Sequence, residues 1–287
     1  MFETRLIDVA GLPFPCRIAA TVFAPQEQSR GVVLAVHGLS RQKRDFDDMA
    51  VYLAQSGYTV YCVDVPGRGG SSWLPSADDY NLDTYARVLA ALIDQQGWGR
   101  VHWVGSSMGG LIAMTLPAID RADVLRSLTL IDVTHKPNAA ACARIASYMP
   151  DTLPLITDRA AYLAFVKQNL PLGPVGEDVW ARFADHQLVA VPGGYVAHFD
   201  PNLVPLAKQV LAEGIDLTQG VAALDCPLSL VAGEISDLCG AREIADLKAI
   251  KPDMPVFICA GAGHIPALAD DASNAFIAAF LHDAEAA

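Results

Sequence analysis

The chain has 287 residues, of which 52% are apolar and 18% are charged, a composition that argues against a disordered chain and is typical of a well-packed globular protein. Its formal net charge of −12 argues against nucleic acid and anionic membranes as partners. The nearest approach to a basic cluster is Arg41, Lys43 and Arg44. Three aspartates follow it directly, so we interpret it as a solvated helix start.

The six cysteines form no Cys-x-x-Cys pair and no Cys/His grouping of the kind that binds zinc. Several lie in apolar, strand-like runs such as Tyr61-Cys62-Val63, so we interpret them as reduced core residues of a cytoplasmic protein. Residues 1–10 lack the basic and apolar regions of a signal peptide. No apolar run reaches the roughly 18 residues of a transmembrane helix. We therefore expect neither segment.

Strand and helix patterns alternate through the first half of the chain. Residues 5–9 and 17–23 alternate in hydrophobicity around Gly11-Leu12-Pro13 and predict an antiparallel hairpin. Continuous apolar runs, typical of strands buried on both faces, then cover residues 31–36, 58–63, 101–105 and 125–131. The segments between them predict helices at 46–55, 82–95 and 109–116. This order predicts an α/β fold with a doubly wound, mostly parallel sheet.

The alternation is interrupted between residues 134 and 224, where Pro and Gly separate mainly helical segments. These helices are predicted at 139–147, 159–169, 179–188 and 203–212. Strand-like runs return at 228–232 and 256–259, and a last helix is predicted at 271–282. We therefore expect a core formed by residues 1–133 and 225–287, with an eight-stranded sheet. Residues 134–224 are expected to form a mainly helical cap insertion.

The pentapeptide Gly105-Ser106-Ser107-Met108-Gly109 has the pattern G-x-S-x-G. It lies between a predicted buried strand and a predicted helix, which is the context of a nucleophile elbow. Such a tight turn requires small neighbours, and Gly105, Gly109 and Gly110 meet that requirement. A serine there projects above the carboxyl edge of the sheet, beside the free N–H groups of the helix. We interpret Ser107 as a nucleophile.

Three further motifs surround this elbow. His37-Gly38-Leu39-Ser40 follows the first buried strand, Asp64 to Ser71 follows the next as D-x-x-G-x-G-x-S, and Gly261-Ala262-Gly263-His264 follows the last. With the elbow, they make nearly the whole chain resemble the α/β-hydrolase family, in particular the serine-nucleophile, esterase- and lipase-like hydrolases of a bacterial subset. The resemblance implies the α/β-hydrolase fold and a catalytic triad in the chain order nucleophile, acid, histidine.

A serine hydroxyl needs a base, and His264 on its Gly-rich turn is the predicted one. The histidine needs an acid that orients it. The resemblance implies an acid in the loop after residues 228–232, where we expect Asp237, although Ser236 occupies the slot that many members use. Asp132, after the strand 125–131, is the alternative position, and Glu234 is a further candidate.

The oxyanion hole needs two backbone N–H groups. The resemblance implies that Leu39 and Met108 supply them and that the His37 side chain has a structural role. Asp64 is interpreted as a brace of its Gly-rich turn. The sequence contains no dinucleotide fingerprint, Walker A motif or H-E-x-x-H motif, so we expect no cofactor and no metal.

A serine at the elbow argues against dehalogenase and epoxide hydrolase chemistry, which uses aspartate there in this family. We therefore predict a carboxylesterase-like serine hydrolase that acts on a small-molecule acyl substrate, with a small or medium apolar group. A carbon–carbon bond hydrolase, a lactonase and a ligand-sensing protein with little turnover are the alternatives. The natural substrate and homo-oligomer formation stay open. Five aromatic residues of the insertion either line the pocket or pack the cap onto the core: Tyr148, Tyr162, Phe165, Trp180 and Phe183.

Overall fold

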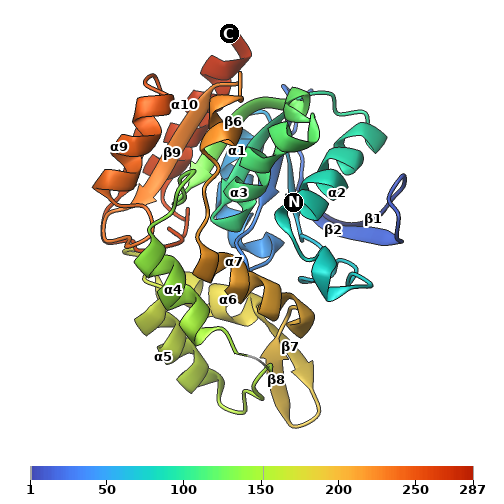
Figure 1. Cartoon of the computed structure of the whole chain (residues 1–287), viewed down its shortest axis with the longest axis vertical. Coiled ribbons are helices and arrows are strands. Elements are labelled where there is room, and N and C mark those ends of the chain that lie inside the picture. Colours follow the sequence, from blue (N-terminus) through green and yellow to red (C-terminus); the bar gives the residue numbers. More distant parts are fainter. Residues whose placement is uncertain (1, 151, 287) are drawn as a thin grey trace.

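A computed structural model describes residues 2–150 and 152–286, which form an α/β-hydrolase fold around an eight-stranded, mostly parallel sheet (Figure 1). The strand order is β1-β2-β4-β3-β5-β6-β9-β10. The strands are β1 (Phe2–Val9), β2 (Cys16–Phe23), β3 (Val32–Val36), β4 (Thr59–Val63), β5 (Val101–Ser106), β6 (Leu125–Ile131), β9 (Leu228–Gly233) and β10 (Val256–Cys259). Within this sheet, the pairs β1–β2 and β2–β4 are antiparallel, and the other strand pairs of the described residues are parallel. The predicted fold class is confirmed.

Helices cover both faces of this sheet. On one face, α1 (Asp47–Gln55) and α10 (Asp271–Ala286) pack in one cluster with Val33 and Ala35 of β3. On the other face, α2 (Leu82–Gln95), α3 (Met108–Thr115) and α9 (Ala241–Ile250) pack with Leu34 and Val36 of the same strand. Neighbouring residues of a strand point to opposite faces, so a strand covered on both sides is apolar throughout.

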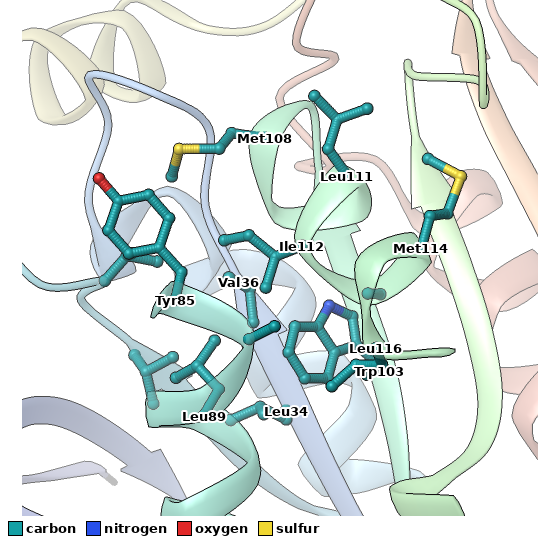
Figure 2. Close-up of a cluster of buried hydrophobic side chains, with 14 of the residues drawn as sticks. Leu34, Val36, Tyr85, Leu89, Trp103, Met108, Leu111, Ile112, Met114 and Leu116 are labelled. Atoms are coloured by element: carbon teal, nitrogen blue, oxygen red, sulfur yellow. The ribbon is translucent and has the colours of Figure 1, made fainter. Parts of the chain in front are cut away.

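Trp103 of β5 anchors the larger of these two layers. Its side chain is fully buried, and its indole N–H donates to the carbonyl of Gly109 at 3.0 Å. Figure 2 shows the ring beneath α3, beside Leu116, with Leu89 of α2 and Leu34 nearby. A buried indole needs a partner for its N–H group. The strand β5 and the helix α3 that follows it are therefore held together just below the turn that joins them.

The sheet reverses its order of strand addition at β3. The chain adds β4 on one side of β3 and β5 on the other, so the loops that follow β3 and β5 diverge from neighbouring strand ends. Such a switch point is where open α/β sheets bind ligands, outside the carboxyl ends of the strands. His37 follows β3 at this point, and Ser107 follows β5.

Residues 134–224, here called the cap segment, lie between β6 and β9. Most of its elements gather at the lower end of the molecule in Figure 1, whereas residues 218–222 pack against α3 of the core. Its elements are α4 (Ala139–Tyr148), α5 (Arg159–Asn169), α6 (Glu177–His186), β7 (Leu188–Val191), β8 (Gly194–Ala197), α7 (Val204–Glu213) and α8 (Thr218–Ala222). Four of its helices match the sequence prediction closely. The hairpin β7–β8, which pairs around Pro192 and Gly193, was not predicted, nor were α8 and the core helix α9. The boundaries of core and cap remain a prediction.

None of the helices in the described part of the chain combines the length and the apolar character that a lipid bilayer requires of a spanning helix. All six cysteines are buried and unpaired.

His102 of β5 should make the stability of the fold depend on pH. Burial lowers the pKa of its imidazole from 6.5 to about 4, and its Nδ1 lies 2.8 Å from Ser127 Oγ. The unfolded chain therefore binds the proton more tightly, so His102 contributes stability above pH 6.5 that is lost as the pH falls toward 4. Replacing it by Asn keeps a partner for Ser127 and removes the titration.

We expect wild type to lose about 2 kcal/mol more unfolding free energy than His102→Asn between about pH 7 and about pH 4.5. Urea denaturation at the two pH values measures this difference, and His37, which titrates in the same way, is present in both proteins. An equal loss in the two proteins would contradict a neutral, buried His102.

Candidate active site

Ser107 lies on a strained turn between β5 and α3. Its backbone has a φ of 48°, unusual for a residue with a side chain, and its N–H donates to the Ile131 carbonyl at 2.9 Å. A Cβ on Gly105 would lie 2.5 Å from the Gly109 backbone, and one on Gly109 would lie 2.0 Å from the Val36 carbonyl oxygen. Only glycine fits at these positions. The sequence prediction of a nucleophile elbow therefore has a steric basis in the structure.

His264 reaches this serine from the turn after β10. Its Nε2 lies 3.0 Å from Ser107 Oγ, and its side chain is almost completely buried. The preceding residue, Gly263, donates its N–H to the Pro171 carbonyl of the cap segment at 2.7 Å. A Cβ on Gly263 would lie 2.6 Å from the Pro171 ring, so the turn that carries the histidine packs directly against the cap segment.

Asp132 is the carboxylate that contacts this histidine. Its Oδ2 lies 2.8 Å from His264 Nδ1 and accepts the Ser236 hydroxyl at 2.6 Å, while its Oδ1 accepts the Gly233 N–H at 2.8 Å. The side chain is fully buried and follows directly on β6. Because a carboxylate can only accept hydrogen bonds, Nδ1 of His264 carries the proton and Nε2 is left to accept one from Ser107.

The expectation that Asp237 contacts His264 is wrong. The Asp237 carboxylate turns toward the cap segment, where it accepts Arg144 Nε at 2.6 Å and Nη2 at 2.7 Å, and its side chain is 50% exposed. Glu234 is also turned away, because its carboxylate accepts the Gly261 N–H at 2.8 Å. The slot after β9 that often holds the acid is occupied by Ser236, whose hydroxyl supports Asp132 instead.

The loop after β3 packs against the elbow. A Cβ on Gly38 would lie 3.5 Å from Ser107 Cβ, so Leu39 follows at the edge of the nucleophile turn. His37 holds this loop, since its Nε2 accepts the Val65 N–H at 2.9 Å and its Nδ1 lies 2.7 Å from the Gly38 carbonyl. Burial lowers the pKa of His37 to about 4, so the ring is neutral and can accept at Nε2.

The N–H groups of Leu39 and Met108 have no partner among the turn, loop and cap backbone hydrogen bonds of the described residues. Met108 opens α3, and the first N–H groups of a helix have no partner within it. Both residues line the same cavity as Ser107. Two backbone donors at the edge of a serine are the requirement for binding an oxyanion.

This cavity has a volume of about 600 Å³ and is lined mostly by apolar side chains. It extends from Ser107 and His264 between the core and the cap segment, where Leu206, Val210 and Leu211 of α7 contribute to its wall. Tyr148 and Phe165 line it, whereas Tyr162, Trp180 and Phe183 belong to a separate apolar cluster that joins the cap segment to Ile265 and Ala267 of the core. Both interpretations of the cap aromatics are therefore realised, by different residues.

A sequence model of the alpha/beta hydrolase fold family matches residues 31–175. A 3-hydroxybutyrate-oligomer hydrolase of Cupriavidus necator is 32% identical over 261 residues, which cover 87% of this chain and 88% of that protein. The chain belongs to the α/β-hydrolase fold family.

Two further proteins are similar to this α/β-hydrolase over nearly its whole length. A 2-(acetamidomethylene)succinate hydrolase of Mesorhizobium japonicum is 26% identical over 269 residues, covering 92% of this chain and 89% of that protein. The crystal structure of an alpha/beta hydrolase from Novosphingobium aromaticivorans is 26% identical, covers 98% of both chains and superimposes with a TM-score of 0.83. The similarity therefore includes the cap segment as well as the core.

The cap segment of this hydrolase is tied to the loop after β3. Gln187 Nε2 donates to the Ser40 carbonyl at 2.5 Å, and Arg41 Nη2 donates to the Phe183 carbonyl at 3.1 Å. Arg41, expected on a solvated helix start, is instead buried and paired with Asp45. In the described part of the chain, no group of three or more His, Cys, Asp or Glu side chains is arranged to hold a metal ion.

Gly109→Ala should disrupt the elbow, because the added methyl group would overlap the Val36 carbonyl. We expect a loss of about 3 kcal/mol or more in unfolding free energy, the upper range for overpacking. Gly31→Ala is the matched control, since its Cβ would meet only His102 atoms at 3.8 Å. That variant should stay within about 1 kcal/mol of wild type in urea denaturation. Equal stability of both variants would contradict the close approach at the elbow.

Proposed function

We propose that this α/β-hydrolase is a serine hydrolase that cleaves a small or medium carboxylic ester through an acyl-enzyme on Ser107. The supporting observation is the continuous hydrogen-bonded chain from Ser107 through His264 to Asp132, with distances of 3.0 and 2.8 Å, at the floor of an apolar cavity. Asp132 takes the role of the orienting acid that we first expected for Asp237. The six buried, unpaired cysteines favour a cytoplasmic location for this enzyme.

In the acylation step, Ser107 Oγ attacks the ester carbonyl while its proton passes to His264 Nε2. Asp132 stabilises the imidazolium that results, because Oδ2 already accepts the Nδ1–H group. The hydrogen bonds from Ser236 and Gly233 keep this carboxylate in place during the transfer. His264 then gives the proton to the leaving alcohol as the tetrahedral intermediate collapses to the acyl-enzyme.

The oxyanion of each tetrahedral intermediate is bound by the N–H groups of Leu39 and Met108. In deacylation, a water molecule gives one proton to His264 and attacks the acyl carbon. The second tetrahedral intermediate collapses when His264 returns that proton to Ser107 Oγ, and the acid product leaves. The chemistry is thus a pair of acyl transfers, each with the same base and the same two donors.

The apolar wall of the cavity supports an acyl or alcohol group that is mainly hydrocarbon. Its volume of about 600 Å³ suits a small or medium substrate. The Cupriavidus necator relative acts on 3-hydroxybutyrate oligomers. Such oligomers are esters of a short acyl chain, so we include their dimer and trimer among the substrates to be tested.

Ser107→Ala should abolish hydrolysis of p-nitrophenyl acetate and butyrate, because it removes the attacking oxygen. Ser106→Ala is the matched control. Ser106 is the adjacent serine of the elbow, and its hydroxyl has no hydrogen-bond partner in the described part of the chain. A fluorophosphonate probe followed by mass mapping should label Ser107 in wild type and in the control. Wild-type turnover by Ser107→Ala would refute the assignment, and labelling at another residue would do the same.

Asp132→Asn should lower kcat by roughly 10⁴-fold, by analogy with the loss of the acid in other triads. Asp237→Asn should stay close to wild type, since it breaks only a half-exposed ion pair with Arg144. Steady-state kinetics with p-nitrophenyl butyrate compare the two variants. A larger loss for Asp237→Asn would return the role of the acid to Asp237.

A further inference from the structure

Arg68, in the Gly-rich loop after β4, is a guanidinium buried directly behind the nucleophile elbow. Its side chain is fully buried and is among the largest such side chains in the protein. Nε donates to the Leu39 carbonyl at 2.8 Å, and Nη1 donates to the Pro66 carbonyl at 2.8 Å and to the Tyr85 hydroxyl at 2.6 Å. Nη2 lies 3.4 Å from Met108 Sδ. Every one of these partners is neutral.

Arg68 forms no ion pair with a carboxylate of the described residues. The two buried aspartates of the surrounding loops are engaged elsewhere. Asp64 pairs with Lys43, and Asp200 accepts the Tyr80 hydroxyl. Burying a cation without a counter-charge is unfavourable, so its retention at a site needs a reason beyond packing. An aliphatic side chain of similar length would fill this space without the desolvation penalty.

Two of the four partners of Arg68 belong to the residues whose N–H groups bind the oxyanion in the proposed mechanism. The guanidinium holds the carbonyl of Leu39, a residue that lines the cavity beside Ser107. It also contacts the Met108 side chain, which extends from the start of α3 toward Tyr85 in Figure 2. The Arg68 guanidinium carbon lies 4.9 Å from the centre of the Tyr85 ring, so the group packs between α2 and the elbow.

We propose that Arg68 is a positioning residue of the oxyanion hole. This inference rests on the proposed acyl-transfer function. The fork of the guanidinium keeps Leu39 and Met108 at a constant separation, so that both N–H groups aim at one oxygen. Because no carboxylate of the described residues pairs with this charge, its field favours the negative oxygen of the tetrahedral intermediate over the neutral ester. Arg68 is fully buried and is not among the residues that line the cavity, so we expect it to act through Leu39 and Met108 and not by contact with substrate.

Two substitutions test the two parts of this role. Arg68→Met fills a similar space but removes the charge and all donors, whereas Arg68→Lys keeps the charge and loses the fork. Arg100→Met is the matched control. Arg100 also donates its Nε to a backbone carbonyl, that of Leu125 at 2.9 Å, but precedes β5 at the opposite end from Ser107.

Hydrolysis of p-nitrophenyl butyrate should show the effect in kcat. We expect kcat to fall on the order of 10²-fold in Arg68→Met, the usual loss for one oxyanion donor, with an intermediate loss in Arg68→Lys. KM should change by less than about threefold, since the ground-state ester gains little from the hole. Arg100→Met should retain wild-type kcat and KM.

Inhibition separates positioning of the hole from general damage to the site. A short-chain alkyl trifluoromethyl ketone forms a tetrahedral oxyanion on the serine, and the matching methyl ketone does not. Affinity for the trifluoromethyl ketone should fall by the same factor as kcat/KM in the Arg68 variants. Affinity for the methyl ketone should stay unchanged. An equal loss for both ketones would overturn the proposal, as would wild-type kcat in Arg68→Met.

If Arg68→Met does not fold, Arg68→Lys decides alone. A folded Lys variant with wild-type kcat and wild-type affinity for the trifluoromethyl ketone would overturn the proposal. A wild-type protein without Ser107-dependent hydrolysis of any ester would refute the proposed function and the inference with it. An active wild type with equally active Arg68 variants would refute only the role of Arg68.

Discussion

The close contact between Gly109 and the carbonyl of Val36 is the constraint on which the rest of the site depends. A Cβ on Gly109 would lie 2.0 Å from that oxygen, so the start of α3 packs against the end of β3 with no room for a side chain between them. The contact sets the left-handed backbone of Ser107 and simultaneously places the loop after β3 at its side. One steric requirement therefore brings the Ser107 turn together with Leu39 and Met108. These two residues follow β3 and β5, strands that are distant in the sequence but adjacent in the sheet.

Asp132 is held in place in a different way, by hydrogen bonds from residues that follow two neighbouring strands. Asp132 follows β6, and its two oxygens accept from Gly233 at the end of β9, from Ser236 in the loop beyond it, and from His264 after β10. The loops of three neighbouring strands converge on this one side chain. Its burial is tolerated because each oxygen is hydrogen-bonded. Ser236 occupies the position from which other chains supply the acid, so here that loop contributes support for the charge and not the charge itself.

Much of this architecture could be predicted from the sequence, because its main signals are local. The apolar runs located six of the eight strands, the alternating pattern located the first two, and the glycines of the elbow indicated a tight turn at Ser107. The choice between Asp132 and Asp237 could not be made in this way, because both follow parallel strands at the same edge of the sheet. It depends on side-chain direction, and Arg144 of the cap segment draws Asp237 away. The hairpin β7–β8 was missed because its strands have four residues each, too few for a clear alternation beside a helical pattern.

The cap segment is usually thought of as the part of such a molecule that can change while the core stays the same. Here Gln187 and the Phe183 carbonyl hold Ser40 and Arg41, the two residues that follow Leu39 in the loop after β3. A new cap grafted onto this core would have to supply an amide and a carbonyl at the same places, or the loop would lose its outer support. A change in the cap segment can therefore reach the neighbourhood of Ser107 by two routes, through the cavity wall and through the Gln187 bond to the loop that packs against the elbow.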